Sequence, residues 1–346
     1  MNQSFESLRS QCDRLLVQEP KLRIRNVAER LNVSEMQLLA AQCCDAQAVY
    51  LGTDVKEIFK QLDTLGEVMV LTRNEWCVHE RHGRFEDIQV GKASIGIVLG
   101  PDIDLRMFFS CWKTAWAVRQ SGRFSIQFFD ETGMAIHKVY GTEKTDRQAY
   151  EALVERFRSD SARVPAVTAP EPEQTGLSGQ APDRLRDDWL GMKDTHAFFP
   201  LLKKWNVSRM TALQAAGDDL AQQVDHDAVE RMLQLSVEQE IPIMCFTGNR
   251  GMVQIHSGSI HKLLRTGPWF NILDEKFNLH LNTSAIDSVW VVNKPTTDGW
   301  VTSLEVYEKS GELIVQFFGV RKPGVPELPA WRHLLESLCE KPLATG

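Results

Sequence analysis

The sequence predicts an α+β fold in which one structural unit occurs twice, and three observations support this prediction. The chain has 346 residues, which at roughly 150 residues per domain corresponds to about two domains. The motif Asn32-Val33-Ser34 recurs as Asn206-Val207-Ser208, at an offset of 174 residues (206 minus 32). In each copy a helical pattern precedes a series of short strand-like runs. We therefore expect each half to hold N-terminal helices, a large and mostly antiparallel sheet, and a terminal helix.

The repeat continues along the chain in the same order. Trp116 recurs at the offset of 174 as Trp290, and Ser125 recurs at an offset of 178 as Ser303. Short insertions such as 295–299 explain the small drift. Because chance matches would not keep their order, the sequence indicates a tandem duplication.

The boundary between the copies is predicted in residues 160–183, where four prolines stand among Ala, Glu, Gln, Gly and Thr without apolar periodicity. We expect an N-terminal repeat in 1–159, a Pro-rich linker in 160–183 and a C-terminal repeat in 184–346.

The elements of the first copy can be justified in chain order. Apolar residues at helical spacing fill 23–42, with Ser34 as an N-cap inside this stretch. Alternating or apolar runs then predict strands. The pair FSIQFFD and MAIHKVYG is expected to form a hairpin around 130–133, which is repeated around 309–311. The strand runs are VMVLTR, EWCVHE, SIGIVLG, DLRMFF, WAVRQ, FSIQFFD and MAIHKVYG. A terminal helix is expected at 147–157 and again at 331–338.

Composition narrows the classes of function. The formal charge of −7 (39 minus 46) means that the surface as a whole repels nucleic-acid phosphates. No apolar stretch approaches the roughly 20 residues that cross a bilayer, and the N-terminus shows no secretory signal, so we expect a cytoplasmic protein without membrane insertion. The seven cysteines show no metal-ligand spacing and are expected to be reduced and mostly buried: Cys12, Cys43, Cys44, Cys77, Cys111, Cys245 and Cys339.

The histidines fall into two groups. His79 and His82 lie in a polar strand-to-turn stretch and are expected at the surface. His196 lies in the helical stretch DWLGMKDTHAFFPLLKKW just after the linker. It is either a packing residue beside aromatic side chains or a ligand for a metal or a haem iron held between the halves. The equivalent position in the first half is Leu22 (196 minus 174), so the histidine does not belong to packing common to both copies.

Polar positions differ between the copies, whereas the shared positions are mostly apolar. These differences have two possible explanations. Either the positions drifted on an exposed surface, or they supply cationic and aromatic side chains that would bind two propionates and a flat macrocycle. The differing pairs are Arg106 and His280, Gln120 and Lys294, Lys138 and Gln316, Tyr140 and Phe318, and Glu143 and Arg321.

Several blocks carry a family resemblance. LTRNEWCVHERHGRFEDI, DIDLRMFFSCWKTAWAV, SIQFFDETGMAIHKVYGT, DTHAFFPLLKKWNVS and ELIVQFFGVRKPG resemble the bacterial HemS/ChuS-type family of cytoplasmic haem-handling proteins, also called hemin-degrading factors. The resemblance covers essentially the whole chain. It implies that one haem b is held between the C-terminal sheet and the N-terminal helices and sheet edge, as cargo or as substrate.

The resemblance also implies roles for single residues. His196 is the expected proximal iron ligand, and Arg106 and Phe108 are expected on the opposite, distal side, with Arg106 as the catalytic candidate if haem is degraded. The C-terminal side is expected to be lined by Lys294, Gln316, Phe318 and Arg321, with Arg209 and Phe246 nearby. Some relatives are expected to have Tyr at position 318, so Phe318 lacks the hydrogen bond of a phenol.

The sequence thus predicts a protein that accepts imported haem and degrades it or passes it on, so that iron is released. Degradation would need an external electron donor such as a reductase, because no flavin or nicotinamide motif is visible. One alternative is a non-catalytic haem chaperone or reservoir that supplies a separate haem oxygenase. A more distant alternative is a helix-turn-helix regulator, suggested by Ala28 and the Asn32-Val33-Ser34 turn, but residues 35–39 are too apolar for a DNA groove and are expected in a helical core.

Overall fold

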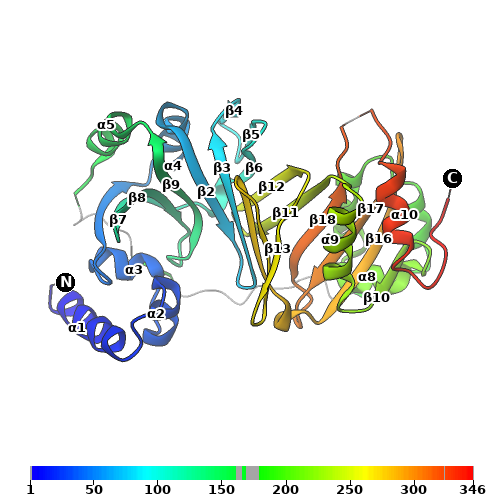
Figure 1. Ribbon diagram of the computed structural model, residues 1–346, viewed down its shortest axis with the longest axis horizontal. Coiled ribbons are helices and arrows are strands. Elements are labelled where there is room, and N and C mark those ends of the chain that lie inside the picture. Colours follow the sequence, from blue (N-terminus) through cyan, green and yellow to red (C-terminus); the bar gives the residue numbers. More distant parts are fainter. Residues whose placement is uncertain (1, 161–165, 169–178, 323, 346) are drawn as a thin grey trace. The chain divides into compact units, whose positions relative to one another are not determined.

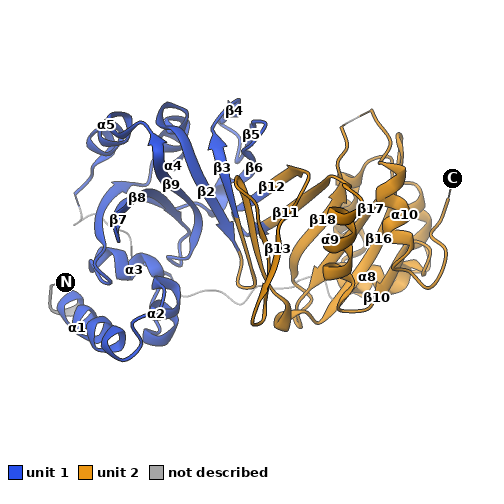
Figure 2. Cartoon of the chain, in the orientation of Figure 1, with its two compact units in different colours: residues 1–73, 80–170, 248–254 blue, residues 74–79, 171–247, 255–346 orange. Residues whose placement is uncertain are grey.

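The computed structural model describes residues 2–160, 166–168, 179–322 and 324–345 (Figure 1). The chain forms two compact units, one of residues 1–73, 80–170 and 248–254 and the other of 74–79, 171–247 and 255–346 (Figure 2). Most of the predicted 160–183 linker lies outside the described residues, so this boundary stays a prediction.

The first half of the chain begins with helices and continues as strands. Its elements are α1 (Asn2–Gln18), α2 (Ile24–Leu31), α3 (Glu35–Ala40), β1 (Gln47–Gly52), α4 (Val55–Lys60), η1 (Leu62–Leu65), β2 (Gly66–Arg73), β3 (Cys77–Arg84), β4 (Ile88–Gln89), β5 (Ile95–Leu99), β6 (Asp104–Phe108), η2 (Phe109–Cys111), β7 (Thr114–Gln120), β8 (Arg123–Phe129), β9 (Ala135–Thr145) and α5 (Arg147–Phe157). Five strands pair antiparallel in the order β1-β7-β8-β9-β2, and three more in the order β6-β5-β4.

The second half repeats this order. Its elements are α6 (Leu185–Leu190), η4 (Thr195–Ala197), α7 (Phe198–Trp205), α8 (Arg209–Ala216), β10 (Ala221–Val224), α9 (Ala228–Glu238), β11 (Ile243–Asn249), β12 (Met252–Gly258), β13 (Leu263–Thr266), β14 (Trp269–Leu273), β15 (Phe277–Asn282), η5 (Thr283–Ala285), β16 (Ser288–Thr296), β17 (Gly299–Tyr307), β18 (Leu313–Gly319) and α10 (Pro329–Glu336). The antiparallel runs β10-β16-β17-β18-β11 and β15-β14-β13 match those of the first half strand for strand. The predicted α+β duplication is therefore confirmed.

The repeated Asn-Val-Ser motif has a physical explanation. Asn32 and Asn206 adopt the left-handed conformation (φ 52° and 53°) that ends α2 and α7. Two residues later, Ser34 accepts a hydrogen bond from the backbone N–H of Gln37 at 3.2 Å, and Ser208 caps α8 in the same way. Each copy of the motif thus stops one helix and starts the next.

The segment considered for DNA recognition lies in the core. Met36, Leu38 and Leu39 of α3 are each at most 3% exposed. A helix whose apolar face is buried in this way cannot present that face to a groove, and the prediction of a helical core for residues 35–39 is confirmed.

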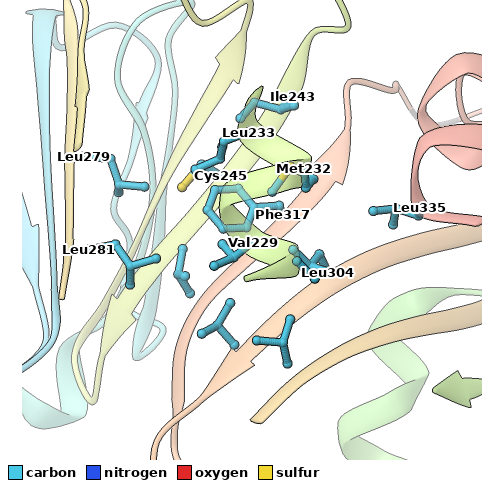
Figure 3. Close-up of a cluster of buried hydrophobic side chains, with 14 of the residues drawn as sticks. Val229, Met232, Leu233, Ile243, Cys245, Leu279, Leu281, Leu304, Phe317 and Leu335 are labelled. Atoms are coloured by element: carbon cyan, nitrogen blue, oxygen red, sulfur yellow. The ribbon is translucent and has the colours of Figure 1, made fainter. Parts of the chain in front are cut away.

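The sheet of the second unit has apolar clusters on both faces. Figure 3 shows the cluster formed with α9 and α10, in which Val229 and Met232 meet Cys245, Leu304 and Phe317 from the strands. Trp290, Val292 and Tyr307 point to the other face and pack with α6, α7 and α8. This second face carries the candidate site.

Other predictions can be checked in the same way. The terminal helix at 147–157 is α5, and the hairpin around Asp130 is closed by hydrogen bonding between the backbones of Asp130 and Met134.

The surface position predicted for His79 is wrong. Its side chain is buried and its ring lies edge-on to that of Phe277, with centroids 4.9 Å apart, because the strand directs this side chain into the apolar interior. Among the described residues, no helix is long and apolar enough to cross a membrane.

Candidate functional site

Four residues predicted from the sequence share one face of the second unit's sheet. Glu305 of β17 pairs with Gln316 of β18, which in turn pairs with Phe246 of β11. One row further along, Ser303 pairs with Phe318. Since paired residues lie on the same face and alternate residues of a strand return to it, Phe246, Gln316 and Phe318 form one surface. Lys294 belongs to this face because its neighbour two residues before, Val292, pairs with Ser303.

Two aromatic rings form the open part of this surface. Phe246 and Phe318 meet edge-to-face, with ring centroids 5.1 Å apart, and both are half-buried. Gln316, which pairs with Phe246 and lies two residues before Phe318 on β18, is also half-buried. The surface can therefore pack against a flat apolar ligand while offering one amide for a hydrogen bond.

His196 is presented by the short turn η4, just before α7. The carboxylate of Asp194 accepts the backbone N–H of His196 at 2.8 Å, and the same Oδ1 lies 2.6 Å from the imidazole Nδ1. With its Nδ1–H held by Asp194, the ring has its Nε2 lone pair available for a ligand. The side chain is 94% exposed, which contradicts the interpretation of His196 as a packing residue.

The charge of Asp194 is favoured by its surroundings. The backbone N–H and the ring of His196, with a further contribution from the guanidinium of Arg321, hold the pKa of the Asp194 carboxyl below its usual range. An ionised Asp194 is the form that accepts the imidazole N–H, so the orientation of His196 persists at neutral pH.

A buried charge cluster centred on Glu305 of β17 packs against Phe198, the first residue of α7. One carboxylate oxygen accepts from Lys294 Nζ at 2.9 Å and from Ser303 Oγ at 3.0 Å. The other accepts from Arg209 at 3.2 Å and from the hydroxyl of Tyr307. Although burial alone raises the pKa of Glu305, the charges of Lys294 and Arg209 outweigh this effect and lower the pKa to about 2. Glu305 is therefore a fully ionised anion that holds two cations.

This cluster supports the turn that carries His196. Phe198, the first residue of α7, packs on Trp189 with ring centroids 4.8 Å apart. Its ring also receives Lys294 Nζ at 4.6 Å and the guanidinium of Arg209 at 5.1 Å from the centroid. Glu305 thus fixes the two cations that contact Phe198, which lies two residues after His196.

Lys294 differs from its predicted role as a lining residue. Its side chain is buried and its ammonium group is directed to Glu305 and Phe198. Arg209 keeps 27% of its side chain exposed and is the cation of the cluster that solvent reaches.

Arg321, which follows β18, offers an unused donor. Its Nη1 is buried and has no hydrogen-bond partner within the described part of the chain. A buried guanidinium nitrogen without a partner is costly, and a carboxylate is the group that would satisfy it. An exposed imidazole, an aromatic surface and a guanidinium with one unpartnered buried nitrogen fit a flat, metal-bearing ligand with carboxylate groups.

The two predicted distal residues lie in the first unit, on β6. Arg106 and Phe108 are alternate residues of this strand, and both are half-buried. The guanidinium of Arg106 pairs with the carboxylate of Asp104 and donates to the carbonyl of Leu105 at 3.0 Å. The position of Arg106 and Phe108 opposite His196 stays a prediction.

The sequence reasoning missed Asp194, Phe198, Glu305 and Tyr307. The role of Asp194 could have been predicted from the sequence, because an Asp two residues before a histidine at a helix start can act both as the N-cap and as a hydrogen-bond partner of the ring. Glu305 had a weaker one: at the offset of 178 it replaces the uncharged Gln127.

The aromatic sheet face, the oriented imidazole and the cations Arg209 and Arg321 fit the class of haem-binding proteins. Comparisons with known proteins agree with this class. A family model for the haemin-degrading HemS.ChuX domain matches residues 32–157 and again 206–338, once in each half. The chain belongs to this HemS/ChuX family of haem-handling proteins.

Full-length relatives support the assignment. The chain is 37% identical to the hemin transport protein HmuS of Yersinia pestis, over 98% of this chain and 99% of that protein. Its structure is similar to that of holo-PhuS, a heme-binding protein from Pseudomonas aeruginosa, with a TM-score of 0.91 and 40% identity over 96% of this chain and 99% of that one. It is also similar to ChuS, an E. coli heme oxygenase, with a TM-score of 0.84 and 34% identity over 92% and 97% of the two chains.

Proposed function

We propose that this protein binds one haem b per chain through His196, in the cytoplasm, and degrades the haem or passes it on so that iron is released. The observation that carries the proposal is the pair of hydrogen bonds by which Asp194 orients the exposed imidazole. The hemin transport activity named for HmuS and the heme oxygenase activity named for ChuS are the two outcomes that the family offers.

Each residue of the site has a definite task in this proposal. His196 offers Nε2 to the iron, and Asp194 holds the proton on Nδ1. Phe246 and Phe318 pack on the macrocycle, and the neighbouring Gln316 offers a hydrogen-bonding group. Haem, when bound, supplies an iron centre that binds small ligands and changes its redox state.

The remaining tasks belong to the cationic residues. Arg321 and the exposed part of Arg209 neutralise the propionates, and Lys294 acts indirectly by holding Phe198. Arg106 is proposed on the distal side, as a donor to whatever binds the iron there. Its pairing with Asp104 fixes the guanidinium in place.

Delivery without degradation is a second candidate, and the exposure of His196 favours it. An imidazole that is 94% exposed can be approached by an acceptor protein, which exchange of the iron ligand requires. Degradation requires electrons from a separate reductase, since the chain carries no flavin or nicotinamide motif.

The experiment that tests the function is a hemin titration followed by reduction in air. The purified protein is expected to develop a Soret band that saturates at one equivalent of hemin. Addition of ascorbate, or of NADPH with a reductase, is expected to bleach the band if the protein degrades haem and to leave it if the protein is a carrier. A protein that stays colourless with excess hemin would contradict the proposal in both forms.

Removal of the carboxylate that orients His196 should weaken binding without removing the ligand. The Asp194→Ala variant is expected to bind hemin about 10- to 100-fold more weakly, because loss of a partner that orients a metal-bound histidine typically has this effect. Asp274→Ala is the matched control, since Asp274 contacts the exposed His261 at 3.5 Å in an analogous pair. Equal affinities for the two variants would exclude a positioning role for Asp194.

A further inference from the structure

Three cysteines meet in the N-terminal helices of the first unit. Cys12 lies in α1, and Cys43 and Cys44 follow α3. The sulfur atoms of Cys12 and Cys44 are 3.1 Å apart, although the two residues are separated by 32 positions in the sequence. Cys12 and Cys43 are buried in an apolar cluster, whereas Cys44 is half-buried and is the thiol that solvent reaches.

The turn that presents Cys44 has an unusual backbone. Gln42, Cys44 and Asp45 all adopt positive φ angles, of 53°, 56° and 56°. Residues other than glycine rarely adopt this left-handed conformation, and such strain concentrates where a side chain must be held in one direction. Here the turn directs the Cys44 sulfur toward α1.

The second half of the chain secures the equivalent helix and turn with an ion pair. Arg186 of α6 donates to both carboxylate oxygens of Asp219, at 2.7 Å each. At the offset of 174, Arg186 corresponds to Cys12 (186 minus 174), and Asp219 corresponds to Asp45, next to Cys44. Both copies therefore join this helix to this turn, and only the first copy does so with thiols.

We propose that Cys12 and Cys44 are a modification site at which hydrogen peroxide forms a reversible disulfide that links α1 to the turn before β1. The Cys44 thiol first loses its proton, and the resulting thiolate attacks one peroxide oxygen. The O–O bond breaks, a sulfenic acid forms, and the released hydroxide takes up a proton, which replaces the one lost by Cys44, to give water. The Cys12 sulfur then attacks the Cys44 sulfur, the S–O bond breaks, and the released hydroxide takes the Cys12 proton to form a second water. Together the two thiols lose two electrons, and these electrons reduce one hydrogen peroxide to two waters.

Burial keeps most of the Cys44 thiol protonated, so that only a small thiolate fraction can react with the oxidant. Burial, together with the neighbouring Cys12 thiol, raises the pKa of Cys43 to about 12, and burial likewise raises the pKa of Cys44. The reaction with peroxide is therefore slow compared with that of an activated cysteine, and the proximity of the two sulfur atoms gives the pair its selectivity.

Peptide mapping of the full-length protein tests the proposal. The protein is treated with hydrogen peroxide, its remaining thiols are alkylated, and tryptic peptides are compared by mass spectrometry with and without dithiothreitol. Cys12 lies in the tryptic peptide 10–14, and Cys43 and Cys44 both lie in 31–56. We expect a cross-link between these peptides that dithiothreitol removes, and the half-buried Cys111 and Cys339 serve as internal comparators that form no cross-link.

Two variants identify the partner of Cys12. The cross-link is expected to persist in Cys43→Ser and to be lost in Cys44→Ser, with thermal melts confirming that both variants fold. A cross-link of equal yield in the two variants would overturn the assignment, as would oxidation of Cys111 or Cys339 without any cross-link to Cys12. In the wild-type protein the oxidised form is expected to melt at a higher temperature than the reduced form, because the disulfide closes a loop of the unfolded chain.

Discussion

The Glu305→Gln variant is expected to lose about 3 kcal/mol of the free energy of unfolding at neutral pH, because two cations then remain in a buried site without an anion. Glu305 is fully buried, and its carboxylate is the common acceptor for Lys294 and Arg209. Denaturant unfolding measures this loss. The control is Glu57→Gln, which removes an exposed ion pair with Lys60 and is expected to change stability by less than about 1 kcal/mol.

The cost of this substitution should depend on pH in a defined direction. The pKa of Glu305 lies near 4.5 in the unfolded chain and at about 2 in the folded protein. Stability contributed by a carboxyl with a lowered pKa is fully present above the unfolded value and is lost as the pH falls through the folded value. The difference between wild type and Glu305→Gln is therefore expected to shrink as the pH falls from 4.5 toward 2, and a difference that stays constant over this range would show that Glu305 is not the charge that holds the cluster.

His196→Ala is expected to have the largest effect on haem binding. Removal of the imidazole deletes the proposed iron ligand and leaves only packing on Phe246 and Phe318 with ion pairing to the propionates. We expect hemin affinity to fall by at least about 100-fold, or roughly 3 kcal/mol, together with a shift of the Soret band. An absorbance titration measures both quantities.

The chain supplies a matched control for this variant. His261 is also exposed and also contacts a carboxylate, that of Asp274. His261→Ala is expected to bind hemin as the wild type does. If His196→Ala and His261→Ala gave the same affinity and the same spectrum, His196 would have no part in binding.

Local features of the fold were predictable from the sequence because they depend on neighbouring residues. The Asn-Val-Ser motif marks helix ends through backbone conformation and side-chain capping, which act within a few residues. The duplicated order of helices and strands followed from comparison of the two halves of the chain. The burial of His79 was not predictable, because its polar neighbours in the sequence give no sign of the apolar residues that enclose it.

Sequence reasoning named the residues that form the aromatic face of the candidate site, but not the buried residues that pack behind it. Phe246, Gln316 and Phe318 were expected from the family resemblance, but their common face depends on the register of strands distant in the sequence. In the sequence, Glu305 looks like any polar residue of a strand with alternating polarity. Its partner Arg209 lies 96 residues earlier in the chain, so their contact could not be predicted from neighbouring residues. No local pattern encodes such a contact.

The most direct test of the central claim is the resonance Raman spectrum of the ferrous haem complex. The wild-type protein is expected to show an iron–histidine stretching band that shifts when histidine is labelled with ¹⁵N. In His196→Ala this band is expected to be absent and to return when free imidazole is added. An iron–histidine band that persists in His196→Ala without added imidazole would contradict the account, because another side chain would then hold the iron.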